Sequence, residues 1–345
     1  MTNPYRRPSK AILATALSAA ILMAATPAYA GTPEPEGVGI AEALDQVVPD
    51  QEFNVIAVLD DVADIPTDST GSTAVEAELN GVEITVPVDP ADALTVEGAD
   101  GLGVAVDLPF SSTAEHADVV DTGIVAYDNG NGSTTVPAVK EDGSVQIATV
   151  IEDSGAPTSY DYGFETNGAT NISVLDDGSV IAVSATGELV FGLLAPWAQD
   201  ADGQPVPTRF EIEDDAIVQI VDHTSQDVAY PVVADPYLFV DLFSKVTKTN
   251  KGSGKFVISA KLSAWGQLIE RTWVVLPSGL GVMVGTGWAE VVSKQPSANT
   301  TVMLQQHQCH ALYGWTLGYK DTWDYESWRS STWNVATWTK KLCNW

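Results

Sequence analysis

Residues 74–86 read AVEAELNGVEITV, and this stretch decides the fold class of the first two thirds of the chain. Asn80-Gly81 stands between two runs in which apolar and polar residues alternate. A two-residue type I′ turn needs positive φ at both central positions, which Asn and Gly adopt readily. The stretch therefore predicts a β-hairpin with strands over 74–79 and 82–86.

Two later turns repeat this pattern. EDGSV begins at residue 141 and DDGSV at residue 176, and each leads into alternating residues. Further strands are predicted over 55–59, 210–212 and 217–221, after a short helix over 38–48. Together these signals predict an all-β N-terminal module, built as a sandwich or a partial barrel.

The charged residues divide the chain into two unlike parts. Residues 31–236 hold 40 of the 46 acidic residues and only two bases, Lys140 and Arg209, for a net formal charge of −38. Residues 237–345 hold 11 Lys or Arg and six Asp or Glu, a net charge of +5, and nine of the ten Trp lie beyond residue 260. Two compositions predict two modules with a boundary at 236/237. The acidity repels polyanions, so we exclude nucleic acid as a partner of the whole chain.

Residues 1–30 have the features of an export signal peptide. Arg6, Arg7 and Lys10 precede an apolar run over 11–25, and Ala28-Tyr29-Ala30 has the small-x-small pattern of a cleavage site. The run is shorter than the ~20 apolar residues of a membrane span. We expect cleavage after Ala30 and secretion without a transmembrane segment, with an uncleaved anchor as the alternative.

Cys309 and Cys343 are the only cysteines. An even pair in an exported chain predicts one disulfide, and a buried pair of free thiols is the alternative. A zinc site needs about four ligands, which two Cys and scattered His do not supply. The run Asp200-Ala201-Asp202-Gly203 begins like a calcium loop but lacks the distant bidentate Glu. We predict no metal and no cofactor, and leave calcium binding by the acidic module open.

The basic module is predicted to be a small α+β domain. Leu238, Leu242 and Val246 have the spacing of an amphipathic helix over 237–246. Strands are predicted over 256–262, 272–276 and 281–292, and a further strand carries Trp323 and Tyr325. A helix over 302–313 is expected, with residue 299, 300 or 301 as its cap.

The boundary segment YPVVADP at 230–236 is predicted to be extended, because residues before Pro are driven from the helical region. With the residues from 196 onward it resembles a segment common in secreted actinobacterial proteins. That resemblance implies a carrier-like N-terminal module joined to an interchangeable C-terminal one.

The C-terminal motifs are GWAEV at 287–291, Cys309-His310, Trp328-Arg329 and Cys343-Asn344. On these residues, the region from about 250 to 345 resembles a bacterial domain of unknown function, the one numbered 2599. The chain departs from the family after Trp323, where Asp-Tyr-Glu-Ser replaces the usual Asn-Leu-Glu-Pro. The resemblance implies a compact extracellular domain and supplies no activity.

Aromatic and basic residues of this module predict its function. Exposed Trp and Tyr beside bases suit a cell-surface glycan or an anionic polymer. We therefore expect non-catalytic binding by the C-terminal module, with the acidic module as a carrier or shield. Docking of the basic face on the acidic module is one hypothesis, and acidity that serves only solubility is the alternative. The predicted binding residues are Trp323, Tyr325, Trp328, Arg329, Lys245, Lys248, Lys251 and Lys255.

Catalysis has weaker support in the sequence. There is no G-x-S-x-G elbow, and Gly252-Ser253-Gly254-Lys255 lacks the residues that a phosphate loop needs. His310 beside Asp321 or Asp324 is the fallback catalytic candidate for a secreted hydrolase. The other alternative is a toxin-like effector that its acidic region keeps inactive.

Overall fold

The computed structural model describes residues 39–47, 57–98, 101–213, 216–272, 277–314, 321–332, 335–341 and 343. All of them belong to one compact unit, Val38–Trp345. The predicted export signal at 1–30 lies outside the described residues.

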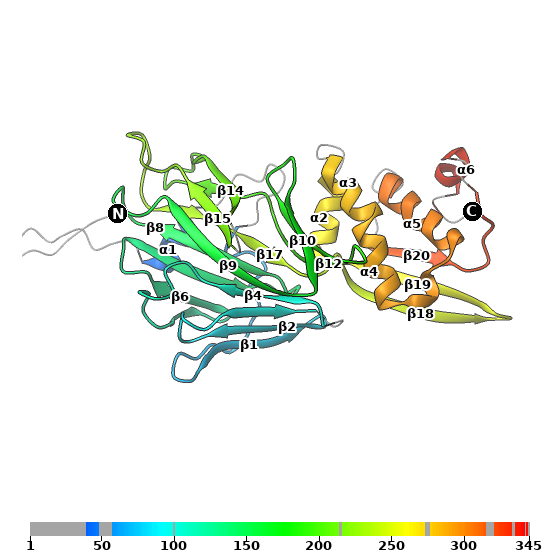
Figure 1. Cartoon of the computed structure of the whole chain (residues 1–345), viewed down its shortest axis with the longest axis horizontal. Helices are drawn as coiled ribbons and strands as arrows, with labels where there is room; N and C mark the ends of the chain where they lie inside the picture. The colour runs from blue at the N-terminus through cyan, green and yellow to red at the C-terminus, as the bar shows by residue number, and fades with distance from the viewer. Residues whose placement is uncertain are drawn as a thin grey trace, which may run out of the picture. The chain divides into compact units, whose positions relative to one another are not determined.

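Two antiparallel sheets form the N-terminal part (Figure 1). The first has seven strands in the order β1-β2-β3-β4-β9-β15-β14. These are β1 (Thr73–Leu79), β2 (Val82–Pro87), β3 (Leu94–Glu97), β4 (Gly103–Asp107), β9 (Ser159–Asn167), β15 (Ala216–Val221) and β14 (Thr208–Glu213).

The second sheet has ten strands, eight of them in the order β10-β11-β12-β17-β8-β7-β6-β5, while β16 pairs with β8 and β13. They are β10 (Ala169–Val174), β11 (Val180–Ser184), β12 (Leu189–Leu193), β17 (Tyr237–Phe239), β8 (Val145–Ile151), β7 (Ser133–Val139), β6 (Ile124–Asp128), β5 (Asp118–Asp121), β16 (Val232–Ala234) and β13 (Ala198–Gln199).

Both sheets contribute to one hydrophobic core, which makes this part a β-sandwich. Phe164 of the first sheet stacks on Phe191 of the second with 5.0 Å between ring centroids. The helix α1 (Ile40–Gln46) packs its buried Ala43 and Leu44 in a separate cluster with Ala148 of β8. The prediction of an all-β N-terminal region is confirmed.

The turn chemistry explains why the predicted hairpins form. Asn80 and Gly81 have φ of 54° and 85°, as the type I′ turn requires. In the repeated turns, Asp142 and Asp177 each accept a hydrogen bond at 3.0 Å from the backbone N–H two residues later, at Ser144 and Ser179. This local bonding accounts for much of the acidic content of the turns.

The C-terminal part is an α+β arrangement, as predicted. Its sheet contains β18 (Phe243–Gly252), β19 (Lys255–Leu262) and β20 (Thr322–Glu326), in that order. The helices lie over one face of this sheet (Figure 1). They are α2 (Ala264–Thr272), α3 (Pro277–Val284), α4 (Thr286–Lys294), α5 (Thr301–Tyr313) and α6 (Val335–Lys340), with a 3₁₀ turn at Pro296–Ala298.

The predicted helix over 237–246 is wrong. Tyr237–Phe239 is β17, a strand of the sandwich between β8 and β12, and β18 begins at Phe243. Leu238 and Leu242 are both buried, but in strand and turn backbone. Their helical spacing is coincidental, because the pairing of β17 with the distant strand β8 determines the conformation of this segment.

The strand predicted over 281–292 is also wrong, since residues there form α3 and α4. The α3 part of this run is rich in apolar residues and glycine and shows no polar face, so periodicity could not reveal that helix. Of the strand predicted over 272–276, residue 272 ends α2 and the others lie outside the described residues. Residues 58–60 form a turn where a strand over 55–59 was expected, and 55–56 are not described.

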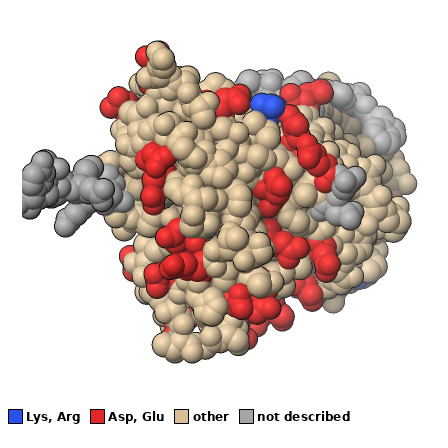
Figure 2. All heavy atoms as spheres, turned by 60° about the vertical axis from the view of Figure 1, so that its left-hand side comes forward, with Lys and Arg blue, Asp and Glu red and all other residues tan. Residues whose placement is uncertain are grey.

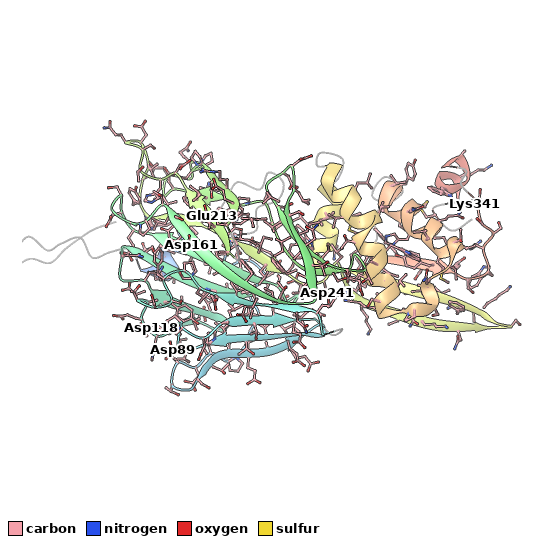
Figure 3. The ribbon with its side chains drawn as sticks, in the orientation of Figure 1. Asp89, Asp118, Asp161, Glu213, Asp241 and Lys341 are labelled. Atoms are coloured by element: carbon pink, nitrogen blue, oxygen red, sulfur yellow. A yellow bond between two sulfur atoms is a disulfide. The ribbon has the colours of Figure 1, made fainter. Side chains whose placement is uncertain are left out.

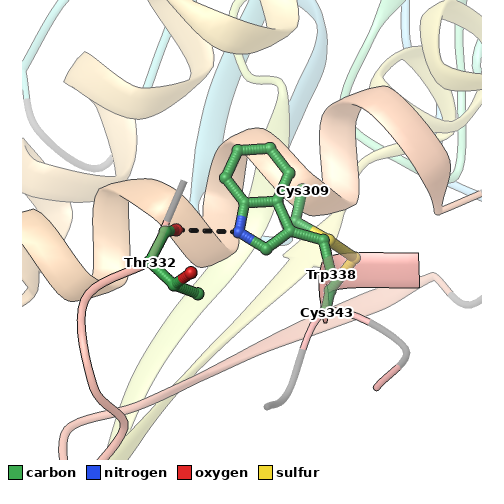
Figure 4. The surroundings of a disulfide bond; sticks show 4 residues. All are labelled: Cys309, Thr332, Trp338 and Cys343. Carbon is green, nitrogen blue, oxygen red and sulfur yellow. Dashed lines mark hydrogen bonds between the residues drawn. A yellow bond between two sulfur atoms is a disulfide. The ribbon is translucent and has the colours of Figure 1, made fainter. Parts of the chain in front are cut away.

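One disulfide links Cys309 of α5 to Cys343, with the two Cα atoms 5.4 Å apart, as predicted. Trp338 of α6 packs against both half-cystines and donates its indole N–H to the Thr332 carbonyl at 2.9 Å (Figure 4). Thr300 caps α5, because its hydroxyl accepts from the Met303 N–H.

Candidate functional site

The strands β18 and β19 form a hairpin of unusual charge. Residues 243–262 include five lysines and no Asp or Glu. All five are exposed, and within the described part of the chain none pairs with a carboxylate. The hairpin extends past the helical layer at one end of the molecule (Figure 1). The lysines are Lys245, Lys248, Lys251, Lys255 and Lys261.

The strand register distributes these charges around the hairpin. Lys245 lies directly opposite Lys261, and such like-charge cross-strand pairs are unfavourable. Lys248 lies on the other face, with its Nζ 4.1 Å from the ring centroid of Phe256. The turn Gly252-Ser253-Gly254 has positive φ throughout and presents no apolar side chain. The hairpin tip is therefore polar and cationic on both faces.

Trp328 lies beside the hairpin, on the loop that follows β20. Ser327 fixes this loop: its hydroxyl accepts from the Phe256 N–H at 2.8 Å, and its own N–H donates to the Phe256 carbonyl at 3.0 Å. Lys255 Nζ lies 5.9 Å from the Trp328 ring centroid, and Arg329 Cζ lies 5.8 Å from it. Six of the eight predicted binding residues thus gather on the hairpin and the adjoining loop.

The other two, Trp323 and Tyr325, are buried and do not form the exposed aromatic face that was expected. They share one face of β20, as the alternation predicts, but that face packs against helix α5. Which face of a strand is covered depends on the neighbouring helix, which the sequence of the strand alone does not reveal.

His307 of α5 is the polar centre of this buried aromatic cluster. Its Nε2 lies 2.7 Å from the Met283 carbonyl and its Nδ1 lies 3.0 Å from the Tyr325 hydroxyl. A carbonyl only accepts, so Nε2 carries the proton and Nδ1 accepts from Tyr325. Burial lowers the pKa of His307 to about 3, so the imidazole is neutral. Both ring nitrogens are used, and His307 has a structural role that the sequence did not single out.

His310, the fallback catalytic residue, stacks on Trp323 with 5.5 Å between centroids. Asp324 follows Trp323 in β20, so its side chain points to the opposite sheet face, where it accepts from the Ser259 hydroxyl at 2.5 Å. The predicted pairing of His310 with Asp324 is therefore wrong. Asp321, the other predicted partner, accepts from the hydroxyl of its neighbour Thr322.

A buried ion cluster joins the helices to the sandwich. Lys294 Nζ lies 2.7 Å from Asp241 and 3.1 Å from Glu290, and donates to the Phe243 carbonyl at 2.9 Å. The Glu290 carboxylate accepts from the backbone N–H groups of Leu242 and Phe243, each at 2.9 Å. Burial acts to lower the pKa of Lys294, but the two carboxylates raise it overall. The i, i+4 spacing of Glu290 and Lys294 was the available sequence signal.

The acidic region presents carboxylates across its surface, with almost no bases on the face that Figure 2 shows. Glu83 of β2 lies directly between Glu78 of β1 and Glu97 of β3, so like charges face each other across the strands. Asp200 accepts hydrogen bonds from the backbone of Asp202 and Gln204 and closes its own turn. Across the described residues, no group of three or more His, Cys, Asp or Glu side chains is placed to hold a metal ion.

Two buried ionisable groups of the sandwich were not anticipated. Lys140 donates to the carbonyls of Val58 and Asp60 at 2.6 and 2.8 Å, which closes the turn found over 58–60. Burial lowers the pKa of Lys140 to about 8. Asp235, in the predicted extended segment, accepts from the Trp197 N–H at 3.1 Å, and burial raises its pKa to about 8.

The helices α2 to α6, β20 and the disulfide are the part of the chain that known proteins share. Residues 263–345 match the family described as protein of unknown function (DUF2599). The match confirms the resemblance seen in the sequence for this region. The DUF2599 region includes Trp328 and Arg329 and begins after Leu262, so the lysine hairpin lies outside it and yet pairs with its strand β20. No curated protein and no solved structure matches the chain.

None of the helices in the described part of the chain has both the length and the apolar character that a bilayer span requires.

Proposed function

We propose that this chain is an exported, non-catalytic protein whose C-terminal domain binds an anionic polymer or glycan through the β18–β19 hairpin. The proposal is based on the composition of the hairpin. Its two strands hold five exposed lysines and no carboxylate, and these lysines form no ion pair with a described residue. Unpaired lysines repel one another, and an anionic ligand relieves that repulsion. The predicted export signal at 1–30 supports an extracellular role in this proposal.

The acidic sandwich acts as a carrier in this proposal. Among the described residues no hairpin lysine pairs with a carboxylate of the sandwich, and the junction contains apolar packing and the Asp241–Lys294–Glu290 cluster. Asp241 lies where the sandwich meets the helices, whereas Asp89, Asp118, Asp161 and Glu213 lie on the sandwich itself (Figure 3). The acidic charge therefore leaves the hairpin available to a ligand.

The test measures the affinity of residues 31–345 for polyphosphate of defined length as a function of salt. The variant Lys248→Gln/Lys251→Gln removes two hairpin charges, and Lys340→Gln/Lys341→Gln is the matched control, because it removes two exposed lysines near the C-terminus. We expect weaker binding only for the hairpin variant. The dependence of log K on log salt should become shallower by roughly 0.7 for each lysine that contacts phosphate. Equal affinities for the two variants would contradict the proposal.

A further inference from the structure

Trp328 is the one exposed large aromatic side chain among the described residues, with 37% of its surface accessible. It sits on a loop that Ser327 ties to the base of the hairpin tip at Phe256. Other tryptophans of the C-terminal domain, such as Trp265, Trp323 and Trp338, fill its core. An indole that is held by a fixed loop and exposed over about a third of its surface presents an apolar patch for a ligand.

The charged groups around this indole are of two kinds. The guanidinium of Arg329 is bound to the carboxylate of Glu326, which fixes both groups. Lys255 makes no ion pair with a described residue. Its Nζ lies over the indole ring, 5.9 Å from the ring centroid, so a ligand that reaches the indole also reaches this cation.

We propose that Trp328, Lys255 and Arg329 form a subsite for one acidic sugar ring of an anionic polysaccharide. This inference rests on the proposed function and names its ligand class. The C–H face of the sugar packs on the indole, and the acid group of the sugar binds Lys255. Arg329 holds the Glu326 carboxylate, and this fixed carboxylate accepts hydrogen bonds from sugar hydroxyls.

Other polyanions fit this patch less well. Single-stranded nucleic acid is bound by several aromatic side chains that stack successive bases, whereas one exposed aromatic is present in the described residues. Membrane insertion needs apolar side chains at the leading edge, and the hairpin tip consists of Lys, Gly and Ser over 251–255.

The experiment compares residues 31–345 and its variants for binding to an oligogalacturonate, to the same oligomer with its acids methyl-esterified, and to polyphosphate. Trp328→Ala should weaken oligogalacturonate binding about tenfold and leave polyphosphate binding unchanged. Trp328→Phe keeps an aromatic ring, so it should weaken oligogalacturonate binding less than Trp328→Ala does. Lys255→Gln should reduce the preference for the acid over the ester, while the other hairpin lysines keep part of it.

The outcomes separate this inference from the proposed function. Unchanged oligogalacturonate affinity in a folded Trp328→Ala variant overturns the subsite and leaves the hairpin proposal intact. The sugar assignment would be overturned if the parent protein bound single-stranded DNA more tightly than oligogalacturonate and the Trp328→Ala variant lost that DNA binding. Unchanged polyphosphate binding by the Lys248→Gln/Lys251→Gln variant would contradict the proposed function itself.

Discussion

Lys294 of α4 lies 2.7 Å from the carboxylate of Asp241, and this pair fastens the helical layer to the turn through which the chain leaves the sandwich. Both side chains are largely buried. The same lysine contacts Glu290, whose carboxylate holds the backbone of Leu242 and Phe243. The turn between β17 and β18 is therefore bound by charged groups of one helix, so the two compositional halves share a fixed joint.

The first prediction concerns this joint. Lys294→Met should destabilise the fold by about 3–5 kcal/mol, because it leaves the carboxylates of Asp241 and Glu290 buried without their cation. Arg209→Gln is the control, since Arg209 pairs with Glu211 on the exposed surface and such pairs contribute about 0–1 kcal/mol. Denaturant unfolding of both variants measures the difference. Equal losses would show that the Lys294 cluster adds nothing beyond a surface ion pair.

The second prediction concerns acid stability. The unfolded chain protonates His307 below its ordinary pKa of 6.5, whereas the folded chain does so only near pH 3. Protons therefore favour unfolding in this window, and the contribution of His307 to stability should rise with pH from about 3 to 6.5. The slope for one group is at most about 1.4 kcal/mol per pH unit.

Unfolding free energies at pH 4.5 and 7 test this dependence. His307→Gln should flatten it, although the variant will be less stable at both values. His116→Gln should not, because His116 lies on the sandwich with 72% of its side chain exposed. A His307→Gln protein with the pH profile of the parent would show that other groups cause the acid sensitivity.

The third prediction has the opposite sign. Burial raises the pKa of Asp235 from 3.8 to about 8, so the folded chain keeps a proton that the unfolded chain loses near pH 4. Stability from this group should fall as pH rises between about 4 and 8. Asp235→Asn keeps an acceptor for the Trp197 N–H and should remove the decline, whereas Asp161→Asn, on the exposed face of β9, should not. Melting curves at pH 5 and 7.5 decide between these outcomes.

The sequence predicted those elements that local chemistry determines. The hairpin at Asn80-Gly81 could be predicted because these two residues adopt the positive φ angles that the turn requires. β17 was missed because Tyr237 pairs with Gln146, 91 residues earlier, and no local pattern encodes that contact. α3 was missed because a helix that is apolar on all sides has no polar face to mark its period.

The same distinction applies to the candidate site. Charge composition identified the lysine segment even though the predicted element was wrong, because charge does not depend on backbone conformation. Alternation correctly placed Trp323 and Tyr325 on one face of a strand. The packing of α5 then buried that face and left Trp328, in the following loop, exposed.

The fourth prediction concerns export. The chain isolated from culture supernatant should begin at Gly31, because Ala28-Tyr29-Ala30 follows the apolar run directly. N-terminal sequencing checks this result. A membrane fraction in which the chain still begins at Met1 would contradict both cleavage and release.

The last prediction concerns the disulfide. Cys309 and Cys343 are 34 residues apart, and the chain-entropy model assigns a loop of this size roughly 3–4 kcal/mol. The bond also holds Trp338 of α6 against α5, so its loss removes packing as well as a constraint. Cys309→Ser/Cys343→Ser should lower the melting temperature of the C-terminal domain and expose Trp338, which a shift of tryptophan emission would report.

Asn299→Ala, just before the α5 cap residue and outside this cluster, serves as a control and should leave Trp338 buried. Free thiol in the denatured, unreduced parent protein, or an unchanged melting temperature in the double variant, would count against a stabilising bond.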